Sequence, residues 1–108
     1  MKKTIISSPL TKRLLIEMGE NLRLSRLRRN LSIRAIAHRT GVSVNTVASL
    51  EKGSPGVSVG VLANILHSLG LADDIALLAK DDLLGRKLQD LELLPKKRAS
   101  KRKMQEEI

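Results

Sequence analysis

One segment, residues 31–53, limits the possible folds of this 108-residue chain more than any other. Its sequence, LSIRAIAHRTGVSVNTVASLEKG, predicts two short helices joined by a tight turn. Ser32 and Ser43 stand at the two predicted helix starts, where a serine side chain can accept a hydrogen bond from a backbone N–H two or three residues on. Gly41 lies between the helices, where the left-handed conformation that ends a helix is least costly for glycine.

Apolar residues in this segment recur at helical spacing. Ile36 and Ala37 on the first helix are predicted to face Val47 and Leu50 on the second. The side chains left on the outside of the second helix are mostly short: Val44, Asn45, Ala48, Ser49 and Lys52. A helix with a small outer face, held rigidly by a partner helix, fits the major groove of DNA.

The matching signature of a known family comprises Leu31-Ser32, Ile36-Ala37, Gly41-Val42-Ser43, Thr46-Val47 and Leu50-Glu51-Lys52-Gly53, followed by a closing helix over residues 62–69. With this signature the sequence resembles the Xre family of helix-turn-helix regulators, the relatives of lambda repressor and Cro, over roughly residues 19–71. The resemblance implies an all-α, lambda-repressor-like bundle. Many relatives carry Gln where this chain has Ile33 and Val44, so bidentate contacts from Gln to adenine are not available at these positions.

Three residues of the second motif helix are predicted to read DNA bases. Asn45 can address adenine with a paired donor and acceptor, Ser49 is tolerant of several bases, and Val44 can meet a thymine methyl group. The alternatives are that Asn45 and Ser49 are ordinary exposed polar residues, and that Val44 packs beside Val47.

A second set of residues is predicted to contact phosphates. Ser32 and Arg34 lie at a helix start, where backbone N–H groups also favour an anion. The alternative for each member of the set is a place on an ordinary solvated face. The full set is Arg23, Ser32, Arg34, Arg39, Thr46, Lys52 and Ser54.

Arg26 and Glu51 match positions that form an internal ion pair in the Xre family. The resemblance therefore implies that Arg26 ties the first helix of the domain to the end of the second motif helix. The alternative is that Arg26 is simply exposed.

Composition narrows the class of partner. The net charge is +9, and residues 19–56 hold seven basic and two acidic residues, whereas residues 57–94 hold three basic and six acidic ones. A basic motif region favours phosphate binding. The absence of Phe, Tyr and Trp favours duplex DNA over single strands, which stack their bases on aromatic rings.

Catalysis and cofactor binding have no support in the sequence. No Ser-His-Asp set or phosphate-cradling glycine loop is present, and the isolated His38 and His67, with no cysteine, make no metal site. We therefore predict a protein that is not an enzyme and binds no cofactor or metal. The sequence shows neither a signal peptide nor a membrane span, which predicts a cytoplasmic, nucleoid-associated protein without a membrane partner.

Four regions are predicted along the chain. They are an N-terminal arm (1–10), a helix-turn-helix domain (11–71), a C-terminal helical extension for dimer or partner contact (72–94) and a basic tail (95–108). Thr11 is expected to cap a first helix running to about residue 30, with Leu24 and Leu27 continuing toward the core. Gly19 either is tolerated in this helix or splits it in two.

The extension has a resemblance of its own. Asp81-Asp82, Leu84-Gly85-Arg86 and Leu94-Pro95-Lys96, followed by a run of Lys and Arg, resemble the C-terminal part of HipB-type regulators, the partners of HipA-like serine/threonine kinases. This resemblance implies a homodimer that represses its own operon within a toxin–antitoxin module and holds the kinase. The alternatives are a protein–protein module that mainly grips the kinase, and a stand-alone Xre regulator without a toxin.

Overall fold

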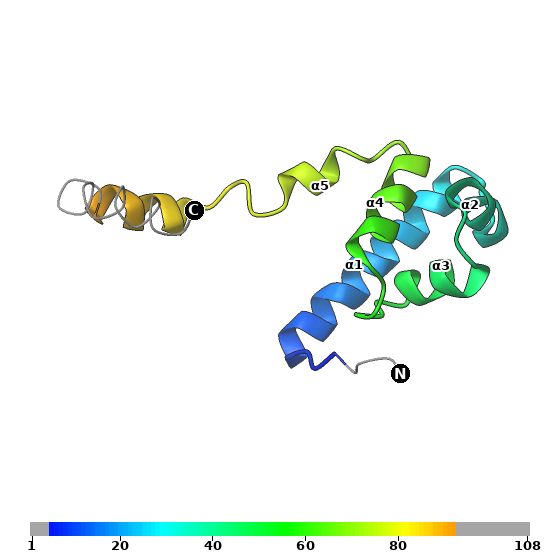
Figure 1. Ribbon diagram of the computed structural model, residues 1–108, viewed down its shortest axis with the longest axis horizontal. Helices are drawn as coiled ribbons and strands as arrows, with labels where there is room; N and C mark the ends of the chain where they lie inside the picture. The colour runs from blue at the N-terminus through cyan, green and yellow to red at the C-terminus, as the bar shows by residue number, and fades with distance from the viewer. Residues whose placement is uncertain (1–4, 93–108) are drawn as a thin grey trace, which may run out of the picture. The chain divides into compact units, whose positions relative to one another are not determined.

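The computed structural model describes residues 5–92, and over that range the chain is all-α, as predicted (Figure 1). The predicted basic tail lies outside the described residues. The chain divides into two compact units, Met1–Ile75 and Ala76–Ile108. The helices are α1 (Pro9–Arg28), α2 (Ile33–Thr40), α3 (Val44–Glu51), α4 (Val59–Ser68) and the short α5 (Asp74–Leu77), and residues 83–92 are also helical.

Serine side chains cap the helices of the motif, as predicted. The hydroxyls of Ser32 and Ser43 each accept a hydrogen bond from a backbone N–H at 3.0 Å, at the starts of α2 and α3. Ser58 caps α4 in the same way at 3.1 Å. Gly41 ends α2 in the left-handed conformation, with φ of 72°. Replacing one such serine by alanine costs about 1 kcal/mol of stability.

The first helix begins earlier than predicted. Thr11 is not its cap, because the hydroxyl of Ser8 accepts the hydrogen bond from the backbone N–H of Thr11 at 3.1 Å. Pro9 then occupies the first turn, where its missing N–H and its fixed φ are both favourable. Two residues of the predicted arm therefore belong to α1.

The core of the first unit is built where α2 packs against α3 and α4, and α1 packs against α3. The prediction that Leu24 and Leu27 face this core is wrong, since both are exposed. Gly19 and Arg26 are buried on α1 instead, about one turn before and one turn after Leu22. The buried apolar residues are Leu22, Ile36, Ala37, Val47, Leu50, Ile65, Leu66 and Leu69.

Gly19 allows α1 to lie directly against the end of α3. A Cβ atom at this position would lie 2.6 Å from the carbonyl oxygens of both Leu50 and Glu51. These are backbone atoms, which cannot rotate away. The helix is not split at Gly19. Glycine lowers the stability of a helix, but at this position a larger residue would not fit against α3.

In the second unit, Asp82 caps the helix over 83–92, because its Oδ1 accepts a hydrogen bond from the backbone N–H of Gly85 at 2.9 Å. Asp81 and Asp82 both precede this helix, and Asp82 is the residue that caps it. No residue between 76 and 92 is buried. Within residues 5–92, no helix has the length and apolar character needed to cross a bilayer.

Candidate nucleic-acid interface

The exposed side of α3 carries the residues predicted to read bases. Val44 and Asn45, in the first turn, are exposed, and Ser49, one turn further on, is half-buried. Val44 leaves 45% of its surface exposed, whereas Val47 is 1% exposed and belongs to the core. The two valines therefore have different roles, and the alternative in which Val44 packs into the core beside Val47 is not what the structure shows.

Asn45 and Ser49 border a cavity of about 420 Å³ between α3 and the start of α4. Thr46 and Ser54, both predicted to contact phosphate, line the same cavity. Its remaining polar residues are Ser43 and Ser58, whose sequence positions indicated only helix caps. The starts of α3 and α4 thus meet at one cavity. The sequence signal for this is the short loop, residues 52–58, that separates the two helices.

Several hydroxyl groups at this interface already take part in hydrogen bonds within the protein. Ser54 accepts from the backbone N–H of Gly56 at 3.3 Å, and the side-chain oxygens of Ser43 and Thr46 lie 2.8 Å apart. The Ser32 hydroxyl is the acceptor for the cap of α2. Because a hydroxyl can accept and donate at the same time, Ser32, Ser54 and one of the pair Ser43 and Thr46 remain able to donate to a phosphate or a base edge.

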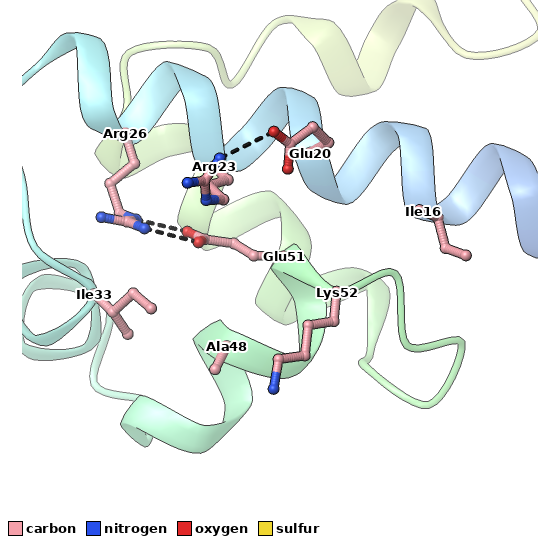
Figure 2. Close-up of a pocket in the computed structure, with 8 residues that line it drawn as sticks. All are labelled: Ile16, Glu20, Arg23, Arg26, Ile33, Ala48, Glu51 and Lys52. Atoms are coloured by element: carbon pink, nitrogen blue, oxygen red, sulfur yellow. Dashed lines mark hydrogen bonds and ion pairs between the residues drawn. The ribbon is translucent and has the colours of Figure 1, made fainter.

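Figure 2 shows a second cavity, of about 630 Å³, between α1, the start of α2 and α3. Ile16, Ile33 and Ala48 form its apolar part. Lys52, exposed at the end of α3, and Arg23, from α1, supply cations on its border. An apolar wall flanked by cations suits a sugar–phosphate backbone, whose deoxyribose is partly apolar and whose phosphate is charged.

The Arg26–Glu51 ion pair lines this cavity (Figure 2). Arg26 Nε and Nη2 donate to the two carboxylate oxygens of Glu51 at 2.7 and 2.9 Å, and Nη1 donates to the carbonyl of Leu31 at 2.8 Å. Both side chains are only 9% exposed. The hydrogen bond to Glu51 raises the pKa of the Arg26 guanidinium above its ordinary value. Arg26 therefore joins α1, α3 and the α1–α2 connection, and it is not the exposed residue of the alternative interpretation.

Arg23 makes a different kind of pair. Its Nη1 donates to Glu20 Oε1 at 3.0 Å, one turn earlier on α1 (Figure 2). The two side chains are 47% and 51% exposed, so water screens this interaction. Arg23 can therefore exchange Glu20 for a phosphate at small cost.

The structure separates the two arginines of α2. Arg34 is exposed in the first turn, beside Ile33 of the cavity in Figure 2. Arg39 instead lines a cavity with Thr40, and with His67 from the end of α4. α4 has ten residues and so spans about 15 Å. Arg39 thus lies near the opposite end of α4 from the hydroxyl-lined cavity, and the structure does not bring it together with the other predicted phosphate contacts.

Two capped helices joined at a left-handed glycine, with a small-residue face on the second and cations beside it, define a helix-turn-helix DNA-binding domain. The chain belongs to this family: residues 17–79 match the model described as "Helix-turn-helix domain". This class supports a role in DNA-binding transcription regulation. No group of three possible metal ligands occurs among residues 5–92.

One similar solved structure is the clp gene regulator ClgR from Corynebacterium glutamicum. The two sequences are 29% identical, the match covers 77% of this chain and 95% of that one, and the TM-score is 0.49. No curated protein matches the sequence significantly.

Proposed function

We propose that the protein is a dimeric, sequence-specific repressor that binds duplex DNA with α3 in the major groove. The observation that carries this proposal is the exposed first turn of α3, where Val44 and Asn45 are accessible, on a helix that borders two cavities suited to the DNA backbone. Asn45, Ser49 and Val44 would then contact bases. Phosphate contacts would come from Arg23, Ser32, Arg34, Thr46, Lys52 and Ser54.

Arg39 is not part of this proposed phosphate set, because it lies with His67 at the ends of α2 and α4. The proposal still leaves a net positive charge along the DNA side. Arg23, Arg34 and Lys52 come from three different helices, so they would contact phosphates at three points around α3. Such contacts fix the register of the domain on DNA without selecting a sequence.

The test is selection of bound duplexes from a random pool with the full chain, followed by competition with random DNA. We expect an inverted repeat whose half-sites lie one or two helical turns apart, each turn about 34 Å. Asn45→Ala should relax one position in each half-site. Recovery of no enriched sequence, together with equal affinity for every duplex, would contradict base reading by α3.

We further propose that the protein is a HipB-type component of a toxin–antitoxin module, partnered with a HipA-like serine/threonine kinase. This rests on the C-terminal resemblance, which includes Asp82 as a helix cap and Leu84, Gly85, Arg86 and Leu88 in the helix that follows. The exposed leucines of that helix also support the alternative, in which the protein is mainly a protein-binding module. A pull-down from the native host distinguishes these functions: a co-purified kinase supports the toxin–antitoxin role, and its absence favours a stand-alone regulator.

A further inference from the structure

The helix over 83–92 carries a row of exposed leucines. Leu84, Leu88 and Leu91 are 69%, 51% and 77% exposed. Their spacing of four and then three residues places them along one side of the helix. Between residues 83 and 92 this helix buries no side chain in its own unit, and helices in proteins are stabilised mostly by the packing of an apolar face. Another surface therefore has to cover the leucines if the helix is to be stable.

The same spacing is that of the d, a and d positions of a coiled-coil heptad. With Leu84 at d, Lys87 takes position g and Glu92 takes position e of the following heptad. These two positions border the leucines on opposite sides. In a parallel, in-register pair of helices, each g residue faces the following e residue of the other helix. Lys87 of each copy would thus face Glu92 of the other copy, which gives two ion pairs.

We propose that the helix over 83–92 pairs with the same helix of a second copy, parallel and in register. This deepens the proposed function, because it rests on the proposed dimer and names the surface that forms it. In an antiparallel pair, g residues face g residues, so Lys87 would face Lys87 of the second copy. Like charges at this position disfavour that arrangement. A parallel pair also starts both helices at the same end.

Cysteine cross-linking tests the arrangement directly, because the natural chain has no cysteine. In a parallel, in-register pair, equal positions at d meet, so Leu84→Cys alone should form a disulfide-linked dimer on oxidation. In an antiparallel pair a positions meet d positions, so Leu84 would lie opposite Leu88, and only a mixture of Leu84→Cys and Leu88→Cys chains would link. Gln89→Cys, on the outer side of the helix, is the matched control and should link poorly.

A charge test of the full chain is independent of cysteine chemistry. Lys87→Glu should weaken the dimer by about tenfold at low salt, because two attractive pairs become repulsive. Combining it with Glu92→Lys should restore dimerisation, which analytical ultracentrifugation measures. An antiparallel pair would show neither effect, because its facing residues would remain of like charge in every variant.

The two experiments separate this inference from the proposed function. Linking by Leu84→Cys alone, together with rescue by the double charge swap, supports the parallel pair whether or not DNA binds. No linking above the Gln89→Cys control, linking only in the mixed sample, or a monomer at all concentrations would overturn it. DNA binding by such a monomer would leave the DNA-binding function intact. A cross-linked dimer that fails to bind any duplex would instead contradict the proposed function.

Discussion

Removing Arg26 should strongly destabilise the first unit, although the residue is charged and lies on a helix of otherwise exposed arginines. Arg26→Ala leaves the Glu51 carboxylate, 9% exposed, without its two guanidinium hydrogen bonds, and also leaves the Leu31 carbonyl without a donor. Breaking a buried ion pair by removing one partner costs about 3–5 kcal/mol. For a unit of this size each kcal/mol lowers Tm by about 4–8 °C, so Tm should fall by at least about 12 °C.

The matched control is Arg23→Ala, on the same helix and also in an ion pair. Its pair with Glu20 is about half-exposed, and exposed pairs contribute less than about 1 kcal/mol. Thermal and urea unfolding, followed by helical circular dichroism, would measure both variants. Arg26→Lys should recover only part of the loss, because an ammonium group cannot make the paired contact with both carboxylate oxygens. Equal destabilisation by Arg26→Ala and Arg23→Ala would refute the reasoning from burial.

The pH dependence of this pair follows from the direction of the pKa change. Glu51 raises the pKa of Arg26 in the folded state. A group with a raised folded-state pKa contributes stability that is fully present below its unfolded pKa and is lost as pH rises through the folded one. The guanidinium contribution is therefore constant from neutral to mildly alkaline pH, well below the ordinary pKa of arginine. Stability measured between pH 6 and pH 9 should show no loss attributable to Arg26.

Three further changes test the interface and the packing. Asn45→Ala should weaken specific DNA binding by about 1–3 kcal/mol and leave random DNA unaffected in competition titrations, and equal losses on both would remove Asn45 from base reading. Arg34→Ala should weaken binding to all duplexes and flatten the salt dependence by about one unit, whereas Arg39→Ala should change neither; a flattened slope for Arg39 would contradict its placement. Gly19→Ala should lower the free energy of unfolding by about 1–3 kcal/mol in urea, because the added methyl group forces α1 and α3 apart. An unchanged free energy of unfolding would show that the two helices can move apart without cost.

The motif helices could be predicted from the sequence because their signals are local. A serine before each helix, a glycine after α2 and apolar residues at helical spacing all lie within a few residues of the structure they determine. The start of α1 was predicted wrongly because Ser8 and Thr11, three residues apart, are both possible caps. The presence of Pro9 decides between them, because proline is favourable in the first turn.

The burial of α1 could not be predicted in the same way. Leucines occur on several sides of this helix, so apolar spacing alone does not select Leu22 over Leu24 or Leu27. Which side of α1 is buried depends on Glu51, which lies 25 residues after Arg26 in the sequence. The ion pair between them turns the side of α1 that carries Arg26 toward α3. Only the family resemblance indicated that pair. The location of Arg39 likewise depends on how α2 packs against α4, which no local pattern specifies.

The charge arrangement of the DNA-binding unit would make the proposed second copy important for binding. Its proposed reading residues, Val44, Asn45 and Ser49, are neutral, and the three nearby cations Arg23, Arg34 and Lys52 lie around them. Each phosphate contact adds salt-sensitive affinity without sequence preference, so one unit should bind weakly and discriminate little. Two units joined by the 83–92 helices would bind the second half-site at high effective concentration and multiply the discrimination of each. We therefore expect Lys87→Glu, which alters no residue of the DNA-binding unit, to lower the affinity for an inverted repeat. The affinity for a single half-site should remain unchanged in the same titration, and a fall in both would mean that the helix acts on DNA binding by another route.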